Sequence, residues 1–505
     1  MPRTIYEINT QVWLREQLWA KREGADLADV PREQIKEWAK MGIDAVWLLG
    51  VWTKGAATRE ICRSSPDLRA RFSKIVPDLR DRDIIGSPFS IADYSLDPAL
   101  GDETTLPRLR GKLRAHGIRL ILDFVPNHLA VDHPWVQSHP ERFVGGSDRD
   151  LEREPENYFR TPGQPDRVLA HGRDPYFAGW TDTAQINVFN RGARRAMIDA
   201  LLAVSDRCDG ARCDMAMLAL NGVFKRTWGD LSLLEYPEDG PPEFWAEAIA
   251  AVRERHPDFL FMAEVYWGLE SQLQNLGFDL TYDKALYDRI LSGEGEGIRE
   301  HLVSTRELWG RMVRFIENHD EARAARAFGP RHAAAALLIS GLPGAVLYHE
   351  GQFEGRRAQV PVQLATRPKE PVDNDIGRFY SRLLRACAEP VMHDGEFRAL
   401  EVSPAWEDNP SHRAIVAYAR SLGAERRVVA VNIANHQAQA YIEFPLEGLE
   451  RPVIELRDVL GDAHYYRSRE KLAEKGLYLD MAPGTYHLFR VRPAPEGATP
   501  EGVGT

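Results

Sequence analysis

The sequence predicts an α/β protein built on a closed (β/α)₈ barrel, with an inserted subdomain after the third strand and a C-terminal antiparallel β-sandwich. Short apolar runs alternate with amphipathic helices over about the first 390 residues, which is typical of a parallel sheet. Four of these runs lead directly into acidic, histidine or arginine residues. Acidic groups at the carboxyl ends of the strands are typical of a (β/α)₈ barrel, or TIM barrel.

The strands of the barrel are expected at the apolar runs. In chain order these are Thr10–Leu14, Ala45–Leu49, Arg119–Phe124, Gly210–Asp214, Phe259–Glu264, Phe278–Tyr282, Val313–Glu317 and Gly344–Tyr348. Helical periodicity predicts helices between them at Arg32–Met41, Glu103–His116, Arg191–Asp206, Pro242–Arg255 and His332–Ile339. Gly42 and Gly117 stand where the first two of these helices should end.

Residues 129–185 interrupt this alternation. They are rich in Pro, Gly, Asp, Arg and aromatic residues and show no periodicity. A structureless loop of that length is unusual inside a compact domain. We therefore expect an inserted subdomain over the barrel mouth, and a barrel formed by residues 1–128 and 186–392.

The pattern of predicted elements changes after about residue 393. Short strands separated by turns are predicted at Ala414–Tyr418, Val428–Asn432, Ala440–Phe444 and Tyr486–Val491, a pattern typical of an antiparallel sandwich over residues 393–492. Residues 493–505 are rich in Pro, Gly and Glu, and we expect a disordered tail there.

Bulk properties exclude several kinds of partner. The net charge is −11, with Lys and Arg scattered, so no nucleic-acid partner is expected. No run approaches the roughly 20 apolar residues of a membrane span, and the first residues lack the apolar core of a signal peptide. These features predict a cytoplasmic protein with no membrane partner. The four cysteines form no CxxC pair, so zinc is not indicated.

Four motifs carry the candidate chemistry. They are Asp123-Phe-Val-Pro-Asn127-His128, Gly210-Ala-Arg212-Cys-Asp214, Phe261-Met-Ala-Glu264 and Glu317-Asn318-His319-Asp320. Each alone has a structural explanation, as a capped loop, an ion pair, a helix cap or a polar loop. Their order and their common place at strand ends favour one active site.

The chemistry that these residues suit is glycoside cleavage by two carboxyl groups. Residues two apart on a strand point the same way, so Arg212 should lie beside Asp214 and keep it ionised, as a nucleophile requires. Glu264 follows an apolar run and precedes Val265-Tyr266-Trp267; such a surround favours the protonated form of a general acid. In an enzyme that retains anomeric configuration, the two carboxyl groups should lie roughly 5–5.5 Å apart.

As an ordered set, the motifs resemble the α-amylase family of retaining glycoside hydrolases and transglycosylases, and the similarity extends over nearly the whole chain. The resemblance implies that Asp214 is the nucleophile, Glu264 the acid/base and Asp320 the stabiliser of the transition state. It places Arg212, His128 and His319 around the sugar in the cleavage subsite.

Further substrate contacts follow from the same resemblance. Phe89, in Ser87-Pro-Phe-Ser-Ile-Ala-Asp-Tyr94, falls where an aromatic ring usually stacks on that sugar, and Trp180–Asn187 resembles the motif that closes the inserted subdomain. Other expected substrate-binding residues are Asp123, Asn127, Tyr266 and Trp267. Asn127 is a calcium ligand in many members, so calcium is a candidate ion, although the reaction itself requires no cofactor. His349-Glu-Gly-Gln352 either lines the pocket or caps its own loop.

One departure from the family bears on the substrate. Starch-cleaving members usually carry Lys and His three and four residues beyond the nucleophile, where this chain has Met217 and Leu218. This argues against long-chain starch. Ser87-Pro-Phe89 and Asp132–Val136 are similar to bacterial maltosyltransferases of the family.

Three functions follow. The first is a retaining α-glycosidase, a hydrolase of carbohydrate metabolism that acts on α-glucosides or short malto-oligosaccharides. The second is a transglycosylase that uses the same site to transfer glucosyl or maltosyl units. The third is a catalytically silent sugar-binding protein, which the complete set of three carboxylates disfavours.

Overall fold

The computed structural model describes residues 1–19, 24–161, 163–229 and 241–500. Eight parallel strands form a closed barrel in the order β1, β2, β5, β11, β12, β13, β14 and β15. Their bounds are β1 Thr4–Asn9, β2 Ala45–Leu49, β5 Arg119–Phe124, β11 Gly210–Cys213, β12 Leu260–Ala263, β13 Leu280–Tyr282, β14 Met312–Arg314 and β15 Ala345–His349. The barrel and the antiparallel sheets of the C-terminal region confirm the predicted fold class.

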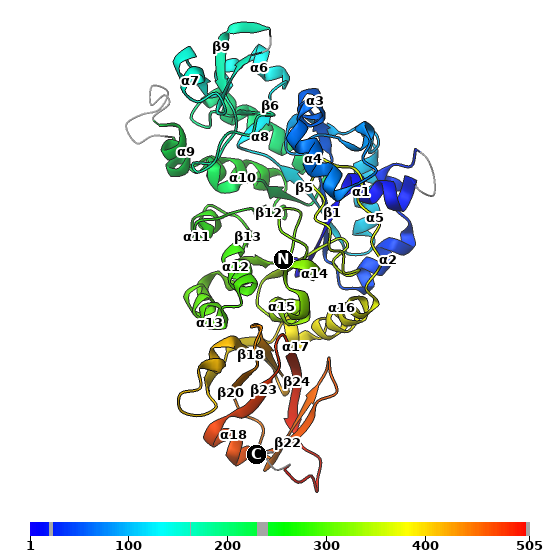
Figure 1. Cartoon of the computed structure of the whole chain (residues 1–505), viewed down its shortest axis with the longest axis vertical. Coiled ribbons are helices and arrows are strands. Elements are labelled where there is room, and N and C mark those ends of the chain that lie inside the picture. Colours follow the sequence, from blue (N-terminus) through cyan, green and yellow to red (C-terminus); the bar gives the residue numbers. More distant parts are fainter. Residues whose placement is uncertain (20–23, 162, 230–240, 501–505) are drawn as a thin grey trace. The chain divides into compact units, whose positions relative to one another are not determined.

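The first strand is the one wrong strand assignment in the barrel. Thr10–Leu14 forms helix α1, and the strand is β1, directly before it (Figure 1). Asn9 ends the strand, and its side chain accepts a hydrogen bond from the backbone N–H of Val12, which caps the helix. The other seven predicted strands overlap those observed, with end differences of up to three residues.

The predicted helices are present with small differences at their ends. They are α2 Arg32–Lys40, α5 Thr105–Arg114, α8 Arg191–Ser205, α10 Phe244–Arg255 and α15 His332–Ser340. The connection after β2 contains more regular secondary structure than expected. It holds β3 Trp52–Lys54, α3 Ala56–Ser64, α4 Pro66–Ile75 and β4 Ile91–Leu96.

The chain divides into two compact units. Unit 1 comprises Met1–Tyr282 and Ala358–Lys369, and unit 2 comprises Asp283–Arg357 and Glu370–Thr505. The sequence boundaries at residues 128, 185 and 392 follow a different division and stay predictions.

Within unit 1, the chain leaves the barrel after β5 and returns through a pair of strands. β6 (His128–Ala130) and β10 (Thr183–Gln185) pair antiparallel, with His128 opposite Gln185. Between them lie α6 Pro134–Ser138, α7 Asp148–Arg153 and a small sheet of β7 Gly145–Gly146, β9 Gln164–Ala170 and β8 Tyr158–Thr161 (Figure 1). The aperiodic stretch of sequence therefore contains regular structure of its own.

Within unit 2, the C-terminal region is a β-sandwich. One sheet has the order β16, β18, β19, β24, β21, β22, and the other β17, β20, β23. The bounds are β16 Glu396–Ala399, β17 Glu401–Pro404, β18 Ile415–Leu422, β19 Glu425–Asn432, β20 Ala438–Glu443, β21 Val453–Asp458, β22 His464–Ser468, β23 Leu477–Met481 and β24 Tyr486–Pro493. Residues of both sheets, such as Val428, Ile442 and Phe489, form one buried apolar core.

Strand β24 extends to Pro493 and Ala494 is buried, whereas residues 501–505 of the expected tail lie outside the described residues. None of the helices in the described ranges combines the length and the apolarity needed to cross a bilayer.

Candidate active site

Asp214 and Glu264 occupy equivalent places at the ends of neighbouring strands. Strands β11 and β12 pair in parallel, with Cys213 opposite Ala263, and each carboxylate follows one residue later. The backbone N–H of Asp214 donates to Phe124 O at 2.9 Å, and that of Glu264 donates to Cys213 O at 3.1 Å. The hydrogen-bonding pattern of the barrel therefore continues for one residue beyond both strands and places the two carboxylates side by side.

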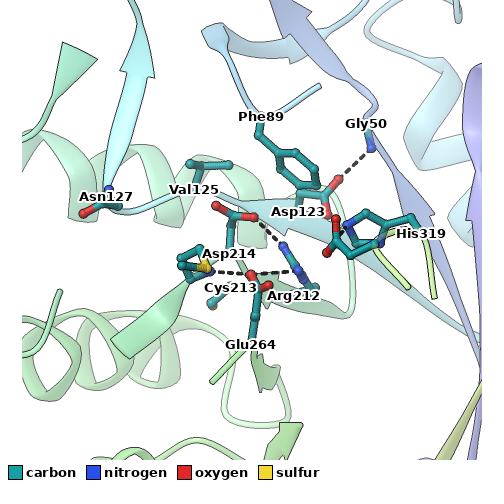
Figure 2. A network of polar contacts seen from close by, with 12 residues as sticks. Gly50, Phe89, Asp123, Val125, Asn127, Arg212, Cys213, Asp214, Glu264 and His319 are labelled. Carbon is teal, nitrogen blue, oxygen red and sulfur yellow. Dashed lines mark hydrogen bonds and ion pairs between the residues drawn. The ribbon is translucent and has the colours of Figure 1, made fainter. Parts of the chain in front are cut away.

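A single guanidinium bridges the two carboxylates. Arg212 Nη1 lies 2.6 Å from Asp214 Oδ1, and Arg212 Nη2 lies 2.8 Å from Glu264 Oε2 (Figure 2). The contact between residues 212 and 214 is the one expected from strand alternation. Burial by itself would lower the pKa of Arg212, which is 0% exposed, but Glu264, Tyr282 and Asp214 hold it well above its ordinary value. The guanidinium stays charged and holds both carboxylates in place.

Glu264 has a more polar surround than the sequence suggested. Besides Arg212, its carboxylate accepts hydrogen bonds from Met215 N at 2.6 Å and from the Tyr266 hydroxyl at 2.6 Å. Met215 has a φ of 43°, an uncommon left-handed conformation for a residue other than glycine. This turn, directly after Asp214, aims the Met215 N–H at Glu264. All three donors stabilise a negative charge on the Glu264 carboxylate.

Aromatic rings surround the Arg212 guanidinium. Its Cζ lies 5.2 Å from the centroid of Trp47, 5.6 Å from that of Phe89 and 5.7 Å from that of Tyr282. Phe89, expected to contact the sugar, is half-buried and lies over this guanidinium. The cation is thus held by ring faces as well as by carboxylates.

Asp123 lies on β5 opposite Arg212, in register with it. Its carboxylate accepts a hydrogen bond from Gly50 N at 2.6 Å (Figure 2). It also accepts one from Trp47 Nε1 at 2.9 Å. Gly50 has a φ of 79°, and a Cβ there would lie 2.7 Å from Pro88 Cβ, so only glycine suits this turn. Asp123 therefore ties β5 to the end of β2.

Asn127 and His128 lie where β5 passes into the inserted subdomain. The Asn127 Oδ1 accepts from Gln185 Nε2 at 2.9 Å, and its Nδ2 donates to Gln185 Oε1 at 3.2 Å. This reciprocal amide pair fixes the direction of the Asn127 side chain, and calcium at Asn127 stays a prediction. The described residues also hold no cluster of three or more His, Cys, Asp or Glu that suits a metal ion.

The His128 ring is an uncharged hydrogen-bonding group. Burial lowers the pKa of His128 to about 4, although Asp182 opposes that shift. The ring packs against Trp180, with centroids 5.0 Å apart. At neutral pH this imidazole can exchange hydrogen bonds with a hydroxyl group but carries no charge.

An exposed aromatic cluster lies three residues beyond Glu264. Trp267 is 40% exposed, has a φ of 64°, and packs edge-on against Tyr176 with centroids 5.1 Å apart. Arg226 Cζ lies within 6 Å of both ring centroids, 5.8 Å from Tyr176 and 5.9 Å from Trp267. Asp174 accepts from the N–H groups of Tyr176 and Phe177 and so shapes the loop that presents them.

Met217 and Leu218 do not offer side chains to a ligand. They form part of a 3₁₀ turn at Ala216–Ala219 and are 0% and 2% exposed. The positions that hold Lys and His in starch-cleaving members are therefore apolar core positions in this chain.

His319 and Asp320 belong to unit 2, on the segment after β14. His319 Nε2 lies 3.1 Å from Asp320 Oδ2, and the Asp320 side chain is 50% exposed. Asn318 Oδ1 accepts from the N–H groups of Asp320 and Glu321, both at 2.9 Å. His349–Gln352 caps its own loop, because the Gln352 side chain accepts from His349 N at 3.1 Å.

Sequence reasoning missed several residues of this site. Tyr282 was assigned only to a strand, yet its hydroxyl accepts from Arg212 Nε at 3.4 Å. Strand alternation was the available signal: Leu280 and Tyr282, two residues apart on β13, point to the same side of the sheet. Met215 gave no signal, because a left-handed turn at a residue other than glycine has no sequence pattern. Arg226 gave none either, because it contacts rings that are distant in sequence.

Known proteins match this chain both in sequence and in fold. The family model "Alpha amylase, catalytic domain" matches residues 26–286. Alpha-amylase MalA of Haloarcula japonica is 26% identical over 394 residues, which are 74% of this chain and 52% of that protein. Alpha-1,4-glucan:maltose-1-phosphate maltosyltransferase 2 of Streptomyces coelicolor is 22% identical over 494 residues, 92% of this chain and 65% of that protein. The chain thus spans about half to two thirds of the length of these relatives.

A solved structure supports the fold. The noncanonic maltogenic alpha-amylase AmyB from Thermotoga neapolitana superposes with a TM-score of 0.67 at 18% identity, covering 97% of this chain and 98% of that one. At this identity, the likeness concerns the fold.

Proposed function

This chain belongs to the α-amylase family, and from that premise we propose that it is a retaining α-glycoside hydrolase acting on α-glucosides or short malto-oligosaccharides. The observation that carries the proposal is the pair of carboxylates, Asp214 and Glu264, held by the one guanidinium of Arg212. A retaining enzyme needs two carboxyl groups close together, one to attack and one to transfer a proton.

The proposed reaction has two steps. In the first, an Asp214 oxygen attacks the anomeric carbon while Glu264 gives a proton to the departing glycosidic oxygen, which leaves a glycosyl ester on Asp214. In the second, Glu264 takes a proton from water, the water oxygen attacks the anomeric carbon, and the ester bond to Asp214 breaks. Before the first step Glu264 takes up a proton from solvent, and its protonated oxygen then faces the glycosidic oxygen in place of one of the present hydrogen bonds, such as that from the Tyr266 hydroxyl.

The family resemblance gives three further roles, to Asp320, His319 and His128. We assign Asp320 to stabilise the positive charge that develops on the sugar ring, a role that suits its half-exposed carboxylate. His319 and His128 bind hydroxyl groups, and His128 does so as a neutral ring because its pKa is about 4. Phe89 supplies a ring face for the same sugar, whereas Asp123 and Asn127 act by fixing the loops around it.

The residues at the positions of the leaving-group subsites favour short substrates over long chains. Met217 and Leu218 are buried, so they offer no polar contact to a long chain. Trp267 and Tyr176 present exposed ring faces instead, and such faces stack on the apolar face of a pyranose.

The same cluster favours a second candidate, a transglycosylase. A sugar stacked on Trp267 could take the place of water in the second step and accept the glycosyl group. Product analysis separates the two functions. Glucosyl or maltosyl transfer to added maltose supports the second candidate, whereas the release of free reducing sugar alone contradicts it.

The decisive experiment uses Asp214→Asn and Glu264→Gln with an α-glucosyl fluoride. Asp214→Asn should lose turnover by at least about 10⁴-fold, because no nucleophile remains. Glu264→Gln should still form the glycosyl ester, because fluoride needs little protonation, and mass spectrometry should find the added hexose on Asp214. Asp258→Asn, at the amino end of β12, is the matched control and should be fully active.

Full activity of folded Asp214→Asn would refute the assignment. Labelling of Asp214 in the native protein would at the same time exclude a silent sugar-binding protein.

The remaining properties follow from the same proposal. The two carboxyl groups suffice for double displacement, so we propose that catalysis requires no cofactor and no calcium at Asn127. We propose a cytoplasmic location, with a saccharide as the partner and neither nucleic acid nor membrane. All four cysteines are free thiols, three of them buried, which suits a reducing compartment.

A further inference from the structure

Unit 2 contains a large groove that is separate from every residue assigned above. It has a volume of about 1070 Å³ and lies among α15, the start of helix α16 (Asn374–Cys387) and the start of β24. Helices α15 and α16 pack against each other (Figure 1). We call this cavity the α16 groove; the residues that matter for its chemistry are His332, Arg357, Asn374, Arg382 and Tyr486.

The acidic residues of the α16 groove are already engaged. Asp373 caps α16, because its side chain accepts from Asp375 N at 3.0 Å and Ile376 N at 3.1 Å. The Asp375 carboxylate forms an ion pair with Arg378. Asp373 keeps its charge while it accepts these hydrogen bonds, so three arginines and two aspartates leave the groove lining with a net charge of +1.

Two arginines of the α16 groove lack an anionic partner among the described residues. Arg357 bonds only through its backbone N–H, which donates to Glu370 Oε1 at 2.8 Å. Arg382 lines the groove together with Tyr486; burial raises the pKa of Tyr486, and the Arg382 charge opposes that rise. The groove therefore holds two guanidinium groups that have no ion-pair partner among the described residues, and its lining is positive overall. They lie beside the amino end of the 14-residue helix α16, which Asp373 caps.

A buried histidine points to a ligand independently of these charges. His332 lines the α16 groove and is 4% exposed. Its Nε2 pairs with the Tyr380 hydroxyl at 2.7 Å, but its Nδ1 has no partner in the part of the chain that is described. An unpartnered buried nitrogen is costly in a folded protein unless something else satisfies it.

The rest of the lining suits an organic body rather than a bare ion. The Tyr486 ring packs edge-on against Phe379 with centroids 5.5 Å apart and stays half-buried. Val372 is 58% exposed at the same groove, and the Asn374 amide can pair with hydroxyl groups. A phosphate alone would fill only a small part of 1070 Å³.

We propose that the α16 groove binds a phosphorylated sugar, with the phosphate between Arg357 and Arg382 and the sugar ring against Tyr486. Guanidinium groups match phosphate oxygens with paired hydrogen bonds, and an aromatic face matches a pyranose. The site is independent of the proposed hydrolysis, since none of its residues takes part in that reaction.

Isothermal titration of the full chain with three probes tests the proposal. Glucose 6-phosphate should bind more tightly than inorganic phosphate, and both more tightly than maltose. Arg357→Ala/Arg382→Ala should weaken the binding of glucose 6-phosphate at least about tenfold, because both charged contacts to the phosphate are lost. Binding by the native chain should also strengthen between pH 5 and 7, as the phosphate takes its second charge.

The control is Arg385→Ala, which removes the same charge from an exposed position of α16 outside the groove. It should leave the binding of glucose 6-phosphate unchanged. Hydrolysis of a nitrophenyl α-glucoside should be the same in all three proteins, so a failure of the catalytic proposal would be seen separately. Equal affinity of the double variant and the native chain, or binding of maltose as tight as that of glucose 6-phosphate, would overturn the proposal.

Discussion

At the scale of the residue, Arg212 decides the geometry of the site, because its two terminal nitrogens hold Asp214 and Glu264 at 2.6 and 2.8 Å. A lysine keeps the charge but presents one compact ammonium, which cannot bridge two carboxylates in this way. We expect Arg212→Lys to lower kcat by about 10²-fold, the effect of a displacement of about 1 Å. Steady-state kinetics on a nitrophenyl α-glucoside measures this.

Arg194→Lys is the matched control. Arg194 is buried and pairs with Glu247 at 2.7 Å on helices α8 and α10, outside the site. It should lower the free energy of unfolding with little change in kcat of the folded enzyme. Native kcat in folded Arg212→Lys would contradict the bridging role.

Single residues show what the sequence can and cannot predict. The contact between Arg212 and Asp214 followed from strand alternation, because both residues lie on one short segment. The surround of Glu264 did not follow, since two of its donors depend on a left-handed turn at Met215 and on the direction of Tyr266. Neither has a signature in residue order.

At the scale of the element, the segment after β14 is held by a buried ionic cluster. Glu317, 0% exposed, lies 2.5 Å from Arg323 Nη1 and accepts from Ala324 N at 2.6 Å. Burial would raise the pKa of Glu317, but Arg323 and His349 hold it below its ordinary value. We expect Arg323→Met to cost about 3–5 kcal/mol of unfolding free energy, because it leaves a buried charge unpaired. Urea unfolding measures this.

Glu317→Gln in the Arg323→Met background separates charge from packing. The double variant should recover part of the lost unfolding free energy, because no charge is then buried. A single Arg323→Met variant as stable as the native chain would show that the cluster does not hold this segment.

The elements also show where pattern reasoning fails. The apolar residues Val12, Trp13 and Leu14 suggested a strand, but all of Thr10–Leu14 is buried, so burial gives no alternation to separate helix from strand. Strands β16 and β22 were missed for the opposite reason. Their residues are half-buried or exposed, and no apolar run marks them.

At the scale of the whole molecule, stability should fall on mild acidification. Burial lowers the pKa of His128, His133 and His332 to about 4, from an ordinary 6.5. In this case the unfolded chain binds protons more readily, so stability is fully present above pH 6.5 and is lost as the pH falls toward 4. Each histidine contributes roughly 2 kcal/mol to the loss between pH 7 and 5. Thermal unfolding across this range measures it.

His133→Asn isolates one contribution. The His133 ring accepts a hydrogen bond from Trp135 N at 3.0 Å and so caps helix α6, a role that asparagine also fills. The variant should be close to native in Tm at pH 7 and less sensitive to pH 5. An unchanged pH dependence would exclude His133 as a source of it.

The overall fold was predictable because the alternation of strands and helices is repeated many times along the chain, and single errors do not alter it. The division into two units was not, because unit 1 takes back the segment Ala358–Lys369 after unit 2 has begun. This segment joins unit 1 through packing against residues that are distant in sequence, and residue order alone does not predict such packing.

The left-handed turn at Met215 limits which residues can replace Met215. The peptide group that follows Asp214 also donates a hydrogen bond to Glu264, so the two carboxylates cannot move apart independently. The turn requires a left-handed backbone conformation at residue 215 but no particular side chain. Glycine or asparagine could stand there with the chemistry intact, whereas valine or isoleucine would disturb both halves of the reaction at once.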